Sequence, residues 1–173
     1  MITIVSGTNR PGNKTQVFAR MFLQLYQAQG LEVQLLDLQS LPADFSSVWM
    51  SDRQSPEVQE MIAKNFRNAD KFHLVVPEYQ GTFPGILKMV FDAVPPRDIR
   101  GKKLALTGIG SGRAGNLRGM DHLAGAFHYL GLHVYPVLQP ISLINDHMNA
   151  EGIVHSEPVL KSMQLQAEGF GKF

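Results

Sequence analysis

The chain of 173 residues contains no cysteine. This absence excludes disulfides, thiolate metal ligands and thiol redox catalysis, so any redox chemistry must come from a bound cofactor. No apolar stretch reaches the about 20 residues that a membrane-spanning helix needs, and the first residues lack the basic and apolar segments of a signal peptide. The net charge is only +1, without a long basic run, which disfavours nucleic acid as a partner. We therefore expect a cytoplasmic protein with no membrane partner.

The apolar residues, 44% of the chain, fall into short runs separated by helical patterns. The length suits one domain over residues 1–173 with a sizeable core. Near-continuous apolar runs, typical of parallel strands buried on both faces, occupy residues 2–6, 33–38, 72–77, 103–108 and 133–137. Helical spacing is found at about 13–29, 56–68, from 84 onward, at 116–130 and at 157–168. Residues 39–55, which include Trp49 and Met50, are predicted to form a long surface loop.

Strict alternation of strands and helices predicts an α/β protein with a doubly wound parallel sheet. Five strands favour the flavodoxin-like three-layer sandwich with strand order 2-1-3-4-5. In such sheets, ligands bind outside the carboxyl ends of the strands near the point where the strand order reverses. The loops after the first, third and fourth strands are therefore expected to form one site.

The first of these loops reads SGTNRPGNKT and leads from a strand into a helix. Gly7 and Gly12 have the spacing of a nucleotide-binding P-loop, but Asn13 intervenes before the Lys-Thr pair and displaces it. A single phosphate fits better, because hydroxyls, an amide, a guanidinium and the helix N-terminus could bind its oxygens. The groups concerned are those of Thr8, Arg10, Asn13 and Thr15. The alternative is a simple turn capped by Asn13, with Lys14 in solvent.

The second loop lies within VVPEYQGTFPGILKMVFD, residues 75–92. Pro77 and Pro84 bracket it, and a loop this rich in proline is stiff and presents backbone amides in fixed directions, which suits a planar ring. The alternative is a rigid connection with Tyr79 packed on the surface. Glu78 is not expected to be a general base, because the sequence places no paired carboxylate beside it.

The third loop contains a G-x-G-x-x-G pattern at residues 110–115, which by itself suggests a dinucleotide site. However, it follows the fourth strand, and no acidic residue for a ribose stands about 20 residues later. Two interpretations stay open: glycines that permit a tight turn, or close backbone approach to a ligand held mainly by the other loops. The six histidines have no metal-site spacing, so no metal is predicted.

With all three loops in view, the sequence resembles the NAD(P)H-dependent FMN reductase family of flavodoxin-like proteins over nearly its whole length. Residues 7–15 are similar to the family's G-S-x-R-x-x-S-x-N phosphate loop. Residues 77–80 with 84–88 are similar to P-E-Y-N…P-G-x-L-K, the most specific of the matches, and residues 115–118 are similar to G-G-x-R. The resemblance implies FMN as cofactor and assigns its binding to Thr8, Arg10, Asn13, Lys14, Thr15, Pro77, Glu78, Tyr79, Gln80, Gly81, Ser111, Gly112 and Arg113.

The departures from the family pattern keep hydrogen-bonding ability in the phosphate loop, where Thr8 and Asn13 replace serines and Thr15 replaces asparagine. Gln80 in place of asparagine moves an amide by one methylene beside the flavin ring. Asn116 in place of glycine adds bulk where the backbone is expected to approach the ligand.

The resemblance implies an enzyme that passes hydride from NADPH or NADH through FMN to a small-molecule acceptor such as a quinone, an azo compound or free flavin. The flavin carries the chemistry, so no catalytic side chain is assigned. A homodimer or higher homo-oligomer is expected, with Trp49 and Met50 covering a partner's site. The alternatives are an FMN-binding electron carrier, which the charge of +1 disfavours, and a flavin-free regulatory or scaffold protein.

Overall fold

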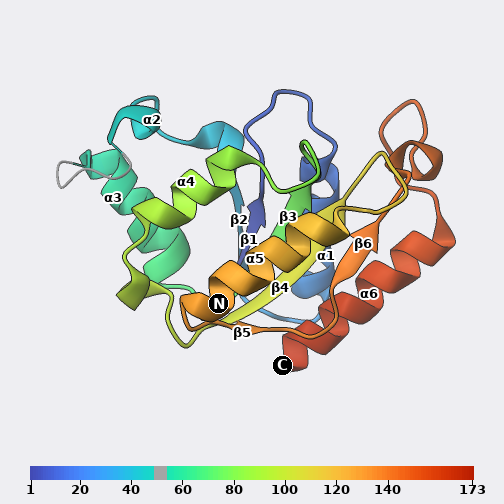
Figure 1. Ribbon diagram of the computed structural model, residues 1–173. Helices are drawn as coiled ribbons and strands as arrows, with labels where there is room; N and C mark the ends of the chain where they lie inside the picture. Colours follow the sequence, from blue (N-terminus) through green and yellow to red (C-terminus); the bar gives the residue numbers. More distant parts are fainter. Residues whose placement is uncertain (49–53) are drawn as a thin grey trace.

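The computed structural model describes residues 1–48 and 54–173 (Figure 1). Its strands are β1 (Ile2–Ser6), β2 (Val33–Asp37), β3 (Lys71–Pro77), β4 (Lys103–Ile109), β5 (His133–Val134) and β6 (Gln139–Ile141). The α-helices are α1 (Thr15–Ala28), α2 (Phe45–Val48), α3 (Pro56–Ile62), α4 (Gly85–Ala93), α5 (Leu117–Tyr129) and α6 (Glu157–Lys172). Shorter helical turns are η1 (Leu38–Ser40), η2 (Ala63–Arg67), η3 (Pro96–Asp98) and η4 (Ile144–His147). Trp49 and Met50, with their predicted covering role, lie outside the described residues.

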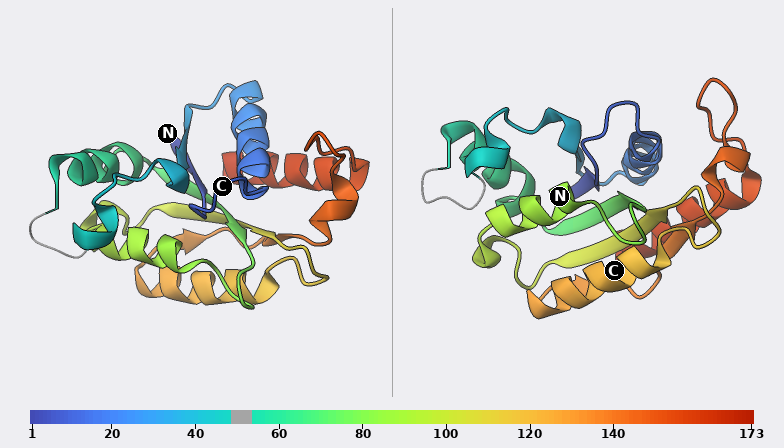
Figure 2. Two further views of the ribbon diagram at one scale, coloured as in Figure 1. Left: turned by 90° about the horizontal axis from the view of Figure 1, so that it is seen from above. Right: turned by 45° about the horizontal axis from the view of Figure 1, so that its top comes forward.

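The strands form a parallel sheet in the order β2-β1-β3-β4-β5, which confirms the predicted flavodoxin-like topology. Helices α1 and α6 cover one face, and α3, α4 and α5 cover the other (Figure 2). Along β3, Phe72 and Leu74 face the layer with α4, whereas Val75 faces α1 and α6. Because both faces are buried, the strands carry apolar residues at successive positions instead of alternating ones.

The predicted strand at residues 133–137 is wrong beyond Val134, because the chain there splits into β5 and a sixth strand, β6, which also pairs with β4. Between the two pairings, residues 135–138 stand opposite only two residues of β4, 105 and 106. Pro136 falls in this excess segment and has no backbone N–H to donate to a ladder. The sheet is therefore interrupted at its edge before it resumes.

The predicted loop at 39–55 is also wrong in part. Asp37 caps η1 by accepting a hydrogen bond from the Gln39 backbone N–H at 3.1 Å, and α2 follows a few residues later. Phe45, at the start of α2, is 2% exposed and belongs to the core cluster beneath α3 and α4. A helix of one turn is too short to show apolar periodicity, so the sequence pattern there resembles a loop.

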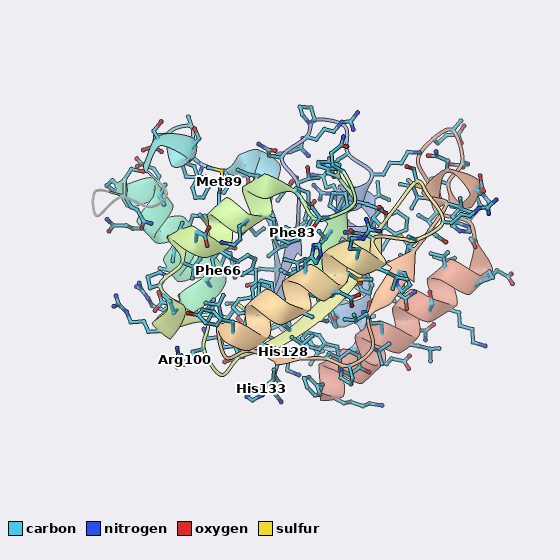
Figure 3. All side chains as sticks on the ribbon, in the orientation of Figure 1. Phe66, Phe83, Met89, Arg100, His128 and His133 are labelled. Carbon is cyan, nitrogen blue, oxygen red and sulfur yellow. The ribbon has the colours of Figure 1, made fainter. Side chains whose placement is uncertain are left out.

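The face covered by α3, α4 and α5 is held by packed aromatic rings. Phe66 of η2 (labelled in Figure 3) meets Phe91 edge-on with ring centroids 5.4 Å apart, and Phe91 meets Phe127 in the same way at 4.5 Å. Such edge-to-face pairs stabilise a core beyond the area that they bury. Three elements far apart in the chain are thereby joined on one side of the sheet.

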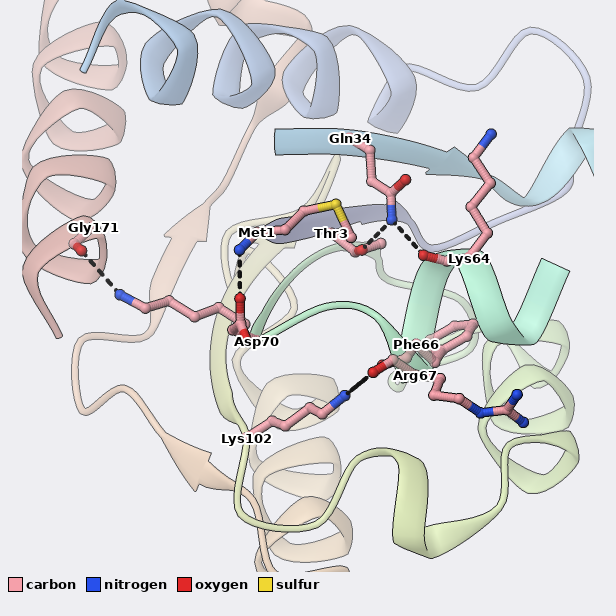
Figure 4. Close-up of polar contacts among 10 residues, drawn as sticks. Met1, Thr3, Gln34, Lys64, Phe66, Arg67, Asp70, Lys102 and Gly171 are labelled. Carbon is pink, nitrogen blue, oxygen red and sulfur yellow. Dashed lines mark hydrogen bonds and ion pairs between the residues drawn. The ribbon is translucent and has the colours of Figure 1, made fainter. Parts of the chain in front are cut away.

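The end of the sheet where the strands begin is closed by side chains that bond to backbone carbonyls (Figure 4). Lys102 Nζ donates to the Phe66 and Arg67 carbonyls at the end of η2, at 2.7 and 2.8 Å. Gln34 Nε2 bridges the Thr3 hydroxyl and the Lys64 carbonyl at 2.9 and 2.8 Å. A lysine at a helix C-terminus satisfies orphan carbonyls and opposes the negative end of the helix dipole. The loops that leave the strands therefore emerge at the other end.

A chain of buried polar groups crosses the opposite layer. Gln166 of α6 donates its amide N–H groups to the carbonyls of Leu106 and Val137, at 2.9 and 3.1 Å, and so bridges the interruption between β4 and β6. Its Oε1 accepts from the Thr107 hydroxyl at 2.7 Å, and Thr107 Oγ1 lies 2.8 Å from His73 Nε2. Gln166 thus replaces the ladder hydrogen bonds that the extra residues remove.

Gln166→Leu is expected to lower the free energy of unfolding by about 2 kcal/mol, because it removes the hydrogen bonds to the Leu106 and Val137 carbonyls and leaves the buried Thr107 hydroxyl without an acceptor. Urea denaturation of the variant and the wild type would measure the loss. The matched control is Gln164→Leu, two residues earlier on an exposed part of α6, where the same substitution should change stability by less than about 0.5 kcal/mol. Equal effects of the two substitutions would contradict the bridging role.

Candidate functional site

A pocket of about 480 Å³ opens at the carboxyl ends of the strands, where the loops gather at the top of Figure 1. Its walls come from the three predicted loops and from a fourth segment around η4. The lining residues are Arg10, Pro11, Gly12, Asn13, Lys14, Thr15, Pro77, Glu78, Tyr79, Ile109, Ser111, Ile144 and Asn145. The topology thus brings the three loops to one site, as the strand order predicts.

The first loop follows β1 and begins in close contact with the backbone of β3. The Gly7 backbone N–H donates to the Val75 carbonyl at 2.8 Å, and a Cβ on Gly7 would lie 2.9 Å from that same oxygen. Any side chain at this position would have to displace the backbone of β3, so the close approach requires glycine.

Asn13 shapes the turn before α1. Its Oδ1 accepts from the Gln16 N–H at 2.9 Å, and its Nδ2 donates to the Arg10 carbonyl at 2.8 Å. This is the capped turn of the alternative interpretation, except that Lys14 is not free in solvent, since its Nζ donates to Asn145 Oδ1. No described residue accepts a hydrogen bond from the backbone N–H of Gly12, Asn13 or Lys14. The turn therefore leaves three N–H donors, unpaired among the described residues, at the N-terminus of α1, next to the basic side chains of Arg10 and Lys14.

The second loop is a tight hairpin. The backbone groups of Tyr79 and Thr82 exchange hydrogen bonds of 2.8 and 3.1 Å across Gln80 and Gly81. Both central residues have positive φ, 52° and 78°, which is the geometry of a type I′ turn. The Tyr79 hydroxyl lies 3.0 Å from the Thr8 hydroxyl, which is fully buried, so Thr8 joins the hairpin to the first loop.

The third loop and the fourth segment are bonded to each other. Leu143 N–H donates to the Gly112 carbonyl at 3.0 Å, and Ile144 N–H donates to the Gly110 carbonyl at 3.2 Å. Sequence reasoning missed this contribution, because the segment follows a strand that was predicted to end at residue 137. The apolar residues Val137, Leu138 and Ile141 around Pro140 were a signal of a further strand leading to the site.

A sequence profile described as "NADPH-dependent FMN reductase" matches residues 1–159. The chain belongs to this family. The FMN reductase family uses FMN, with NAD(P)H as the electron donor. Within residues 1–48 and 54–173, no helix is both long and apolar enough to cross a bilayer, and no group of three or more acidic, histidine or cysteine side chains is arranged to hold a metal ion.

Two curated relatives are distant. An FMN reductase (NADPH) of Pseudomonas aeruginosa is 22% identical over 94 residues, which cover 54% of this chain and 50% of the relative. A subunit of NADH:(hydroxy)cinnamate reductase from Vibrio ruber is 24% identical over 121 residues, covering 69% of this chain and 58% of the relative. The matches therefore span 50% and 58% of the length of these relatives.

Solved structures with the same fold cover 99% of this chain. An NADH:FMN oxidoreductase in its apo form has a TM-score of 0.77 at 19% identity and is covered over 88% of its length. The NAD(P)H:(acceptor) oxidoreductase FerB of Paracoccus denitrificans has a TM-score of 0.75 at 20% identity and is covered over 94%. At these identities the likeness concerns the fold.

The structure places the predicted site residues of this FMN reductase family member in three groups. Those that line the pocket are Arg10, Asn13, Lys14, Thr15, Pro77, Glu78, Tyr79 and Ser111. Thr8 lies behind the lining and supports Tyr79. Gln80, Gly81, Gly112 and Arg113 are at least partly exposed and lie outside the lining.

The donor set fits the phosphate end of FMN. Free N–H groups at the head of α1, together with the positive end of the helix dipole, favour an anion, and Arg10 adds a guanidinium. The one carboxylate in the lining, Glu78, is already engaged, since its Oε2 accepts from the Asn116 N–H at 3.2 Å. Glu78 therefore bonds to the backbone of the third loop.

Proposed function

We propose that this protein is an NAD(P)H oxidoreductase that passes hydride from NAD(P)H through bound FMN to a small-molecule acceptor such as a quinone, an azo compound or free flavin. The observation that carries the proposal is one pocket with the N-terminus of α1, and its N–H groups left unpaired in the described part of the chain, at one end and the second and third loops at the other. When bound, FMN supplies the hydride and electron transfer. The proposal extends to a single FMN-binding domain over residues 1–173.

The side chains of the pocket would bind and orient the cofactor. At the phosphate end, the N–H groups of residues 12–14, the Arg10 guanidinium and the buried Thr15 hydroxyl would hold oxygens. At the other end, Pro77 and Tyr79 on the hairpin side and Ser111 on the opposite side would contact the ring. We assign no side chain to acid or base catalysis, because Glu78 already bonds to a backbone N–H.

The deciding measurement is the visible spectrum of the purified protein, first with added FMN and then with NADPH or NADH under anaerobic conditions. We expect a bound flavin whose absorbance bleaches when the reduced nicotinamide is added. A bound flavin that neither nicotinamide bleaches would favour the electron-carrier alternative, and the absence of flavin binding would overturn the proposal. Turnover with a quinone, an azo dye and free FMN would then rank the acceptors.

Arg10→Ala is expected to weaken FMN binding about tenfold and to leave riboflavin binding unchanged, because only FMN carries the phosphate that the guanidinium would bind. Quenching of flavin fluorescence measures both dissociation constants. Arg97→Ala, an exposed arginine on η3, is the control and should affect neither ligand. An equal loss of affinity for FMN and riboflavin in Arg10→Ala would show that Arg10 does not bind the phosphate.

The cytoplasmic location and the homodimeric or higher homo-oligomeric state stay predictions. Sedimentation analysis of the FMN-loaded protein tests the second of them.

A further inference from the structure

We propose that Asn116 is a positioning residue that sets the geometry of the ring end of the pocket, a role that rests on the proposed FMN function. Asn116 stands just before α5 in the left-handed conformation, with φ +64°, and is 1% exposed. Its Nδ2 donates to two carbonyls at the end of β3, those of Val76 and Pro77, at 3.0 and 3.1 Å. The Asn116 side chain therefore turns toward β3 and away from the pocket.

The orientation of this amide is determined by its partners. Two carbonyl oxygens can only accept, so the Asn116 nitrogen must face them, and a flipped amide would set its oxygen against both. Asn116 Oδ1 points instead at Gly119 and has no partner among the described residues. A buried acceptor without a partner is costly. The position is nevertheless occupied by asparagine, whereas the family pattern that this chain resembles has glycine there.

Glycines on two sides make room for Asn116. A Cβ on Gly119 would lie 2.1 Å from Asn116 Oδ1, so a side chain at 119 would expel the amide. A Cβ on Gly108 of β4 would lie 3.0 Å from the Asn116 Cβ and 2.2 Å from the Gly115 carbonyl oxygen. Because both positions lack a side chain, the turn can lie directly on the sheet and the amide can reach β3.

Asn116 joins the second and third loops in three places. Besides the two bonds from its amide, its backbone N–H donates to Glu78 Oε2 at 3.2 Å. Pro77 and Glu78 line the pocket, whereas Asn116 does not. A change at residue 116 would thus move the wall that is to contact the flavin ring, and it would leave the phosphate loop untouched.

The test compares Asn116→Gly with the wild type in binding FMN and riboflavin. Glycine adopts positive φ readily, so the turn survives and only the side-chain bonds are lost. We expect dissociation constants about tenfold higher for both flavins, equivalent to about 1.4 kcal/mol. Asn116→Asp, which keeps the shape but sets a carboxylate against two carbonyls, should have at least as large an effect. A loss confined to FMN would overturn the positioning role, because it would locate the effect at the phosphate.

Two further measurements distinguish the positioning role of Asn116 from a purely structural one. The visible circular dichroism of the bound flavin, recorded at saturating FMN, should change in Asn116→Gly but not in Asn65→Ala. Asn65 is the matched control, a buried asparagine whose Nδ2 donates to the Met61 carbonyl at 2.8 Å outside the pocket lining. In the flavin-free protein, amide hydrogen exchange at Glu78 and Tyr79 should be at least tenfold faster in Asn116→Gly.

The outcomes separate this inference from the proposed function. An unchanged flavin spectrum together with unchanged exchange in Asn116→Gly would overturn the positioning role even if the wild type is an active reductase. A wild type that binds FMN but whose flavin is not reduced by NAD(P)H would overturn the proposed function. The positioning role of Asn116 would still be tested by flavin affinity and amide hydrogen exchange. A wild type that binds neither flavin would overturn both.

Discussion

Gly108→Ala is expected to reduce FMN affinity at least about 100-fold and to lower the free energy of unfolding by about 3 kcal/mol. A Cβ at this position would lie 2.2 Å from the Gly115 carbonyl oxygen and 3.0 Å from Met120 Cε. The Gly115 oxygen belongs to the backbone and cannot rotate away, so the turn between β4 and α5 must lift off the sheet. That movement breaks the contacts between the second and third loops on which the ring end of the pocket depends.

Gly85→Ala is the control for Gly108→Ala. Gly85 is the exposed first residue of α4, a Cβ there would meet nothing within 4 Å, and the residue is outside the pocket lining. We expect its stability and FMN affinity to be within about 0.5 kcal/mol of the wild type. Urea denaturation and fluorescence titration with FMN measure both quantities. If the two alanine variants behave alike, the close approach at Gly108 does not control the site.

The second large effect is a loss of stability on acidification that depends on His73. Burial lowers the pKa of His73 to about 3, because the interior disfavours the charged ring. Its hydrogen bonds allow one neutral tautomer. The Thr107 hydroxyl donates to Gln166, so it accepts from His73 Nε2–H, and His73 Nδ1 accepts from the Tyr26 hydroxyl at 2.7 Å.

The direction of the pH effect follows from the two states of His73. In the unfolded chain a histidine protonates near pH 6.5, whereas in the folded chain His73 stays neutral down to about pH 3. Between these values the unfolded state binds more protons, so stability falls as the pH falls. The contribution of this one group is about 1.4 kcal/mol for each pH unit, or roughly 4 kcal/mol over the window.

Urea denaturation between pH 3.5 and 7.5 tests this expectation. His73→Gln, which keeps a donor and an acceptor but does not titrate, should be less stable at pH 7 and show a slope smaller by about 1.4 kcal/mol per pH unit. Other titrating groups contribute to both proteins and cancel in the comparison. Parallel pH profiles for the variant and the wild type would contradict a neutral buried His73.

The sequence alone determined the strand order and the gathering of three loops at one pocket. Near-continuous apolar runs identify buried parallel strands, and strict alternation with helices leaves few topologies open. Turn chemistry is similarly local: Asn13 caps the turn before α1, as one of the two interpretations of the first loop predicts. Because the carboxyl ends of parallel strands meet at one edge, loops far apart in the chain could be assigned to one pocket before any contact was known.

The tertiary structure alone decided which side chains complete the site and the sheet. Lys14 meets Asn145 across 131 residues of sequence, and Gln166 reaches Thr107 across 59. Asn116, expected to add bulk near a ligand, instead holds the end of β3. Periodicity and turn signals extend over a few residues, whereas these contacts depend on how distant segments approach once both faces of the sheet are covered. Such contacts leave no pattern in the sequence, because what specifies them is the position of the partner in space.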